Sequence, residues 1–215
     1  DVYKRQILAL PEMEDAVIGR SALGAVLPLL AVALLSACDY SYQRSFLRPS
    51  YRATVFNHAA GGRDLRIETV GNPFDPEQYA DERVGALTAA AMQGHNRGQR
   101  TTFAATPGPS ARPQYKVVIA YNPVEPASYL ALCRGDVESD PTDGRLRVKA
   151  AFCESVDSGP RVLTGVRGRL AEGSVATPET PAYRSLMAGV TRDLFPLWDA
   201  DMDDDRCSGF LFLCH

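Results

Sequence analysis

The sequence RLRVKAAFCESVDSGPRVLTGVRGRL, residues 145–170, decides the fold. Apolar and polar side chains alternate in both of its halves, as they do in strands that bury one face. We expect strands over Arg145–Cys153 and Arg161–Leu170, joined by the turn-forming residues between them. The alternation also predicts that Val162 lies on the buried face and Leu163 on the outer face.

The outer face of this predicted hairpin is basic. Residues 145–170 hold six basic side chains against two acidic ones. The alternation places four of the six on one face: Arg147, Lys149, Arg167 and Arg169. A positive surface of this kind is a candidate site for anionic lipid headgroups, glycolipid phosphates or an acidic partner. The alternative is a solvated sheet face whose charges discourage edge-to-edge aggregation.

Two further strands and two helices flank the hairpin. Period-two alternation predicts strands over Asp64–Val70 and Tyr115–Tyr121. Apolar residues at helical spacing predict helices over Pro76–Gln93 and Pro181–Phe195. A capping residue precedes each helix: Asp75 and Thr180. The order strand–helix–strand–strand–strand–helix predicts an α+β fold. We expect a two-layer sandwich, in which two helices pack on a mostly antiparallel sheet of four or five strands.

The remaining segments are less regular. We interpret residues 38–63 as a lipid anchor and tether, with Arg52–Asn57 as a candidate edge strand. Residues 101–105 are a candidate short strand. Asn122–Asp143 is a long insertion, and an insertion of this length is either functional or stapled in place. The α+β domain is therefore expected over residues 64–197.

Composition and charge exclude several classes of protein. The chain has 215 residues, of which 45% are hydrophobic and 23% charged, and its net charge is -3. These values are typical of a globular protein and argue against a disordered chain, a coiled coil or a multi-pass membrane protein. A dedicated nucleic-acid binder has a basic excess that this chain lacks. We therefore expect no nucleic-acid partner.

The N-terminal region has the pattern of an export signal. Residues 22–34 form an uncharged apolar run of 13 residues, which is too short to span a bilayer but has the length of a signal-peptide core. Leu35-Ser36-Ala37-Cys38 follows and resembles the lipobox of bacterial lipoproteins. A plain signal peptide with an incidental cysteine is the alternative. We interpret residues 1–37 as a signal peptide, in which the first twelve residues look foreign to the pattern.

The resemblance to bacterial lipoproteins has consequences for location. It implies cleavage before Cys38 and attachment of diacylglyceryl and acyl chains there, which would anchor the protein in a membrane and expose it to the periplasm. Asp39 resembles an inner-membrane retention signal, and the choice between inner and outer membrane stays open. We expect no cofactor beyond this covalent lipid.

The other four cysteines suggest disulfides. An even number of cysteines in an exported chain predicts bridges, and local pairing favours Cys133–Cys153 and Cys207–Cys214. Free thiols and a zinc site are the alternatives, although the chain has no CxxC motif. The second pair would close a loop in an acidic C-terminal tail, residues 198–215.

The tail also contains an incomplete calcium motif. Asp199, Asp201 and Asp203 have the spacing that opens a calcium-binding loop. Asp204 and Phe210 stand where such a loop needs glycine and an acidic residue. We therefore expect a solvated acidic turn, with an irregular calcium site as the alternative, and we predict no metal site.

No catalytic motif is present. The chain lacks GxSxG, SxxK and HExxH, and it has no glycine-rich loop ahead of a helix. His58 and His95 are expected in loops, as solvated residues. The order of elements over residues 64–195 resembles that of small envelope lipoproteins such as the lipopolysaccharide-assembly lipoprotein. This likeness is one of topology and does not specify a function.

These observations lead to three functional hypotheses. The main one is a non-enzymatic, lipid-anchored adaptor or accessory subunit of an envelope assembly or transport system, with an envelope protein as its partner. The second is a binding module for an anionic lipid or glycolipid. The third is a small periplasmic hydrolase, which would need His58 or His95 beside a carboxylate and a nucleophile.

Overall fold

The computed structural model describes residues 40–140, 145–173 and 177–197. The signal peptide, Cys38, Asp39 and the acidic tail with Cys207 and Cys214 lie outside the described residues. Within the described ranges, no helix is long and apolar enough to cross a membrane.

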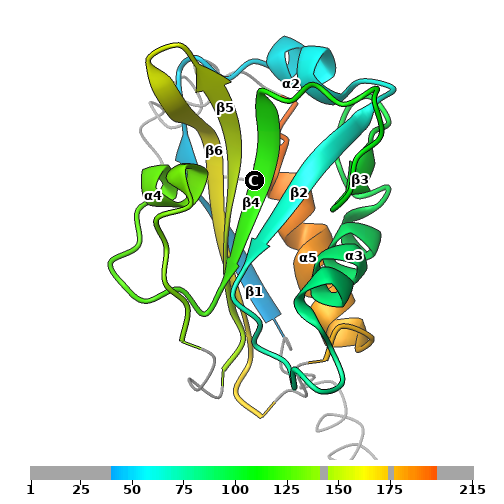
Figure 1. The fold of residues 1–215 in the computed structure, drawn as a ribbon, viewed down its shortest axis with the longest axis vertical. Helices are drawn as coiled ribbons and strands as arrows, with labels where there is room; N and C mark the ends of the chain where they lie inside the picture. Colours follow the sequence, from blue (N-terminus) through cyan, green and yellow to red (C-terminus); the bar gives the residue numbers. More distant parts are fainter. Residues whose placement is uncertain (1–39, 141–144, 174–176, 198–215) are drawn as a thin grey trace, which may run out of the picture. The chain divides into compact units, whose positions relative to one another are not determined.

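The described chain forms a six-stranded sheet with the strand order β1-β6-β5-β4-β2-β3 (Figure 1). The strands are β1 (Tyr40–Leu47), β2 (Asp64–Val70), β3 (Thr102–Ala104), β4 (Tyr115–Tyr121), β5 (Arg147–Val156) and β6 (Gly159–Leu170). The helices are α2 (Ala53–Ala60), α3 (Asp81–Met92), α4 (Tyr129–Arg134) and α5 (Pro181–Leu194). The α+β sandwich predicted from the sequence is confirmed, although the described residues form six strands and four helices where four or five strands and two helices were expected.

The sheet is mixed, with an antiparallel half and a parallel half. Strands β1, β6, β5 and β4 pair antiparallel. Strand β2 pairs parallel with both β4 and β3. The predicted hairpin forms the centre of the antiparallel half, and its turn places Gly159 at φ 109°, a left-handed conformation that glycine adopts without strain.

The two faces of the sheet are covered unequally. Helices α3 and α5 pack on one face, where Phe152 joins a core that includes Leu186 and Val190. On the other face a smaller apolar cluster forms under α4 and includes Leu132 and Ala151. Figure 1 shows α4 in front of the sheet and α5 behind it. Helix α4 covers only part of its face, which leaves the neighbouring area of β1, β5 and β6 open.

A buried hydroxyl cluster joins both main helices to the sheet. The Tyr121 hydroxyl is 2.6 Å from that of Tyr183 and 2.7 Å from Thr88 Oγ1. Thr88 also donates to the carbonyl of Val84. Burial raises the pKa of both tyrosines. The three hydroxyls satisfy one another, as buried polar groups must.

The segment expected to be a tether is part of the domain. Residues Tyr40–Leu47 form β1, an edge strand paired with β6. The rings of Tyr40 and Tyr42 stack at 6.1 Å, and Tyr42 packs against Gly189 of α5, where a Cβ would lie 2.3 Å from the ring. The candidate edge strand Arg52–Asn57 is wrong as well, because these residues open α2.

The first predicted helix is shorter than expected. Helix α3 begins at Asp81, after Ala80 at the N-cap, and not at Pro76. Asp75 instead holds a separate turn, in which its carboxylate accepts from the backbone N–H of Glu77 at 3.0 Å. Asp75 is therefore a local turn former, but the turn that it stabilises does not continue into the helix.

A bulge in β6 reverses the predicted position of two side chains. Phe152 pairs with Thr164 and Cys153 with Val162, so Leu163 is an extra residue on its strand. Leu163 consequently lies in the main core, and Val162 lies in the cluster under α4. Simple alternation cannot predict this exchange, because a bulge shifts the phase of every residue beyond it.

Candidate anion-binding groove

The open part of the sheet face beside α4 is a groove of about 850 Å³. Its floor comes from β1, β5 and β6, and its wall comes from the segment that leads into α4. Its charged lining consists of four basic residues and one acidic residue: Arg147, Lys149, Arg167, Arg169 and Glu125. The four basic residues are those that the sequence placed on one face of the hairpin.

Strand register explains why the four cations meet. Arg147 of β5 pairs with Arg169 of β6, and Lys149 pairs with Arg167. Strand β1 extends both pairs, because Ser41 lies opposite Arg169 and Gln43 opposite Arg167. The groove floor therefore has two cross-strand rows. The first row is Ser41, Arg169 and Arg147, and the second row is Gln43, Arg167 and Lys149.

The two β6 arginines hydrogen-bond to neutral side chains of β1. Arg167 donates to Gln43 Oε1 at 3.0 Å, and Arg169 donates to Ser41 Oγ at 3.3 Å. Both arginines are exposed. Within the described part of the chain, neither forms an ion pair with a carboxylate. Their charges are thus available to an anion that enters the groove.

Lys149 is held differently. Its side chain is 15% exposed and lies 3.4 Å from Glu125 Oε1. Its ammonium also donates to the carbonyl of Ala127 and lies 5.1 Å from the centre of the Tyr129 ring. The carboxylate compensates this charge, and we therefore assign Lys149 mainly to joining the groove wall to the sheet.

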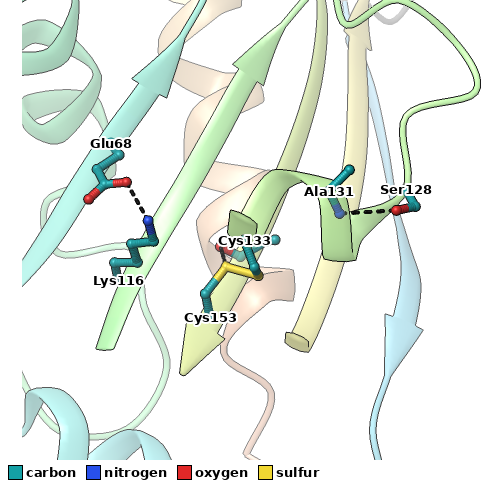
Figure 2. The surroundings of a disulfide bond; sticks show 7 residues. Glu68, Lys116, Ser128, Ala131, Cys133 and Cys153 are labelled. Atoms are coloured by element: carbon teal, nitrogen blue, oxygen red, sulfur yellow. Dashed lines mark hydrogen bonds and ion pairs between the residues drawn. A yellow bond between two sulfur atoms is a disulfide. The ribbon is translucent and has the colours of Figure 1, made fainter. Parts of the chain in front are cut away.

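Helix α4 follows this wall, which ends at the first helical residue, Tyr129, and three local features fix the helix. The side chain of Ser128 accepts from the backbone N–H of Ala131 at 3.0 Å and caps the start of the helix. Gly135 ends the helix in the left-handed region at φ 81°. The Cys133–Cys153 disulfide links α4 to β5 (Figure 2). This predicted bridge is confirmed, and it staples the long insertion as expected.

Tyr129 extends the wall onto the sheet. Its ring lies against the backbone of β6, where a Cβ built on Gly165 would be 2.7 Å from two ring carbons. Only glycine at this position lets the ring approach so closely. Burial raises the pKa of the Tyr129 hydroxyl, so this hydroxyl is neutral at physiological pH.

Asn122 is a supporting residue that sequence reasoning missed. It is 2% exposed and has φ 43°. Its side-chain oxygen accepts from the backbone N–H of Arg147 at 2.7 Å, and its own N–H donates to the carbonyl of Arg147 at 2.8 Å. These bonds fix the start of β5. The available signal was an Asn-Pro pair directly after a strong strand, since asparagine tolerates the left-handed region.

The remaining basic residues of the hairpin are paired elsewhere. Arg161 bonds Glu154 at 2.6 Å, and the same carboxylate accepts from the hydroxyl of Tyr115 at 2.8 Å. Burial and the Glu154 carboxylate raise the pKa of Tyr115 to about 12. Arg145 forms an exposed ion pair with Glu172 at 2.7 Å. Figure 2 also shows the ion pair of Lys116 with Glu68.

The two histidines lie apart from the groove lining. His58 is exposed in the last turn of α2, not in a loop, and its ring meets that of Tyr115 edge-on at 6.1 Å. His95 is exposed in the turn after α3. Among the described residues, no group of three or more His, Cys, Asp or Glu side chains is arranged to hold a metal ion.

Comparisons with known proteins give little further information. No protein-family model and no curated protein matches the chain. One solved structure, a dodecamer of a PelC point variant from Paraburkholderia phytofirmans, aligns with 11% identity over 72% of this chain and 96% of that one, with a TM-score of 0.38. A likeness of this degree carries no argument about function.

Proposed function

We propose that the protein is a lipid-anchored, non-enzymatic component of the bacterial cell envelope whose basic groove binds an anionic ligand. The observation that carries the proposal is the convergence of four cations on one groove through strand register. Glu125 compensates Lys149, whereas Arg167 and Arg169 have only neutral side-chain partners on β1. Like charges at neighbouring positions of a sheet cost folding energy, and a bound anion offsets that cost. Anionic lipid or glycolipid headgroups supply the matching charge at a membrane surface.

The proposed anchor would place the groove at this surface. Cys38 precedes Tyr40, the first residue of β1, by two positions, and Ser41 already lines the groove. Three residues span about 10 Å at most. A lipid on Cys38 would therefore hold the Ser41 end of the groove close to the headgroups. Substitution Cys38→Ser should release the protein from membranes or leave an uncleaved precursor without lipid mass. A lipid-free wild-type protein would refute the anchor.

The groove proposal is tested by charge reversal. Full-length protein carrying Cys38→Ser, and thus no acyl chain of its own, is mixed with vesicles that contain phosphatidylglycerol. We expect binding to be lost when Arg147, Arg167 and Arg169 are changed to Glu. The matched control reverses three exposed arginines at the other end of the sheet: Arg63, Arg66 and Arg100. Equal binding by both triple variants would contradict the proposal.

An adaptor or accessory-subunit role is the second candidate function. It is favoured by the ordered segment 122–140 on the same face, where Val124 is an exposed large apolar residue at 48%. This segment is stapled through Cys133 and so presents a fixed surface. A stoichiometric partner that co-purifies from gently solubilised membranes, and is lost with Val124→Asp, would support this role. Retention of the partner by Val124→Asp would count against it.

A further inference from the structure

The two rows of the groove floor are built alike. In each row an exposed arginine of β6 donates to a neutral polar side chain of β1: Arg169 to Ser41 in the first row and Arg167 to Gln43 in the second. Each row therefore offers a β6 guanidinium group beside a neutral hydrogen-bonding group of β1. This combination recognises one anionic oxygen group by charge and by hydrogen bonds.

The spacing of the rows is set by the sheet. Arg167 and Arg169 are two positions apart on one strand, so their side chains emerge on the same face with about 7 Å between them along the strand. Their β1 partners follow the same repeat, because β1 pairs with β6 in regular register from Tyr40 to Arg44. The bulge in the β1 ladder comes only after Arg44. Both rows thus lie in the regular part of the sheet.

One ligand can contact both rows at once, because the rows share the same groove. Residues of both rows line the same 850 Å³ space. Next to the second row, Lys149 of the floor contacts both Tyr129 and Glu125 of the wall. The negative charge of Glu125 repels any further anion beyond the second row. The positive charge that an anion can reach is therefore concentrated at two places, one in each row, and does not form a continuous basic strip.

We propose that the groove contains two anion subsites, one at Arg169 and Ser41 and one at Arg167 and Gln43, and that its ligand carries two phosphate groups roughly 7 Å apart. This inference rests on the proposed function and defines the class of ligand for the same groove. A ligand with one phosphate occupies either subsite singly. A ligand with two suitably spaced phosphates gains the second contact as an intramolecular event.

A matched pair of soluble probes tests the inference. Full-length Cys38→Ser protein is titrated calorimetrically with the bisphosphate of 1,3-propanediol and with propyl phosphate. We expect the bisphosphate to bind at least about tenfold more tightly. In Arg169→Gln and in Arg167→Gln this advantage should fall to about twofold, the statistical factor for two equivalent phosphates on one ligand. Arg66→Gln, on the same sheet face but on β2, should retain it.

The outcomes separate the inference from the function on which it rests. Equal affinity for the two probes, or an advantage that survives Arg169→Gln or Arg167→Gln, would overturn the two-subsite inference while anion binding stands. If neither soluble probe nor any anionic vesicle binds, the proposed function fails together with it.

The source of the two phosphates is a separate arm of the experiment. Vesicles with cardiolipin, which has two phosphates, are compared with phosphatidylglycerol vesicles of equal total phosphate. A preference for cardiolipin that disappears in Arg169→Gln supports two subsites filled by a lipid. A bisphosphate advantage in solution without a cardiolipin preference supports two subsites filled by a free ligand.

Discussion

Arg147 and Arg169 stand directly opposite each other in the antiparallel ladder between β5 and β6. Like charges at opposed positions destabilise a sheet. The neighbouring pair contains Lys149, whose charge Glu125 compensates, but Arg169 has only the neutral partner Ser41. At Arg169, therefore, the same charge lowers stability and favours anion binding.

Removal of one of the opposed charges should stabilise the free protein. We expect Arg169→Gln to raise the free energy of unfolding by about 0.2–1 kcal/mol, which is the range for cross-strand pairs. The measurement is urea unfolding at low salt. Arg66→Gln serves as control, because Arg66 has an acidic neighbour, Glu68, at 3.9 Å and should not gain stability. A loss of stability in Arg169→Gln would contradict this account of the pair.

Reduction of the disulfide should weaken both the fold and the groove. A bridge across a loop of this length contributes about 3 kcal/mol in the chain-entropy model, and Cys133 and Cys153 are separated by 20 residues. Helix α4 has six residues and is too short to persist without tertiary contacts. We expect reductant to lower the unfolding midpoint and vesicle binding together. The variant Cys133→Ala/Cys153→Ala should not respond to reductant, and a wild-type protein with unchanged binding would contradict the role of α4.

The close approach of Tyr129 to Gly165 gives a test of the groove wall. Gly165→Ala would place a methyl group 2.7 Å from the ring, and overpacking of this kind costs about 1–3 kcal/mol. We expect Gly165→Ala to destabilise the protein and to weaken anion binding. The double variant Gly165→Ala/Tyr129→Ala should lose less stability than the sum of its two single variants. Additive losses would show that the two residues do not press on each other.

Stability at high pH should depend on Tyr115. Its pKa is raised from 10.0 to about 12 in the folded protein, so the unfolded chain loses this proton at lower pH than the folded one. The raised pKa of Tyr115 therefore contributes to folding stability below about pH 10, and this contribution is lost as the pH rises toward 12. We expect the wild-type melting temperature to fall over this interval and Tyr115→Phe to show a shallower fall. Tyr121 and Tyr183 shift in the same direction and should leave a residual slope. An identical slope in Tyr115→Phe would contradict the assignment.

The sequence predicts the central hairpin well, because period-two alternation and register follow directly from the pleat. The four groove cations are on one face for this reason. Two errors have physical causes beyond local pattern. Leu163 changes face through a bulge, which depends on the partner strand. Residues Tyr40–Leu47 were assigned to a tether although they form a strand. The assignment failed because Tyr42 is covered by helix α5, which lies about 150 residues later in the sequence, so a local pattern does not show that this segment packs on the domain.

The groove wall was only partly predictable. The Cys133–Cys153 bridge follows from local pairing of cysteines. Helix α4, however, depends on a cap at Ser128, a glycine at its end and burial of Leu132 against the sheet, and none of these is decisive alone. The role of Asn122 depends on its contact with Arg147, which lies 25 positions away. The sequence was thus sufficient to predict the basic face of the sheet. It was not sufficient to predict that the segment leading into α4 forms a wall beside that face and makes it a groove.

The measurement that tests the central claim most directly is hydrogen–deuterium exchange of the full-length Cys38→Ser protein with and without phosphatidylglycerol vesicles. We predict that the vesicles slow exchange in Ser41–Ser45 of β1 and in Arg167–Arg169 of β6, while exchange in α3 and in β3 does not change. β1 is an edge strand, so it has amides without a ladder partner that a ligand can protect. Protection confined to Arg63–Arg66 and Arg100, with none in the groove, would contradict the claim that the groove is the anion-binding site.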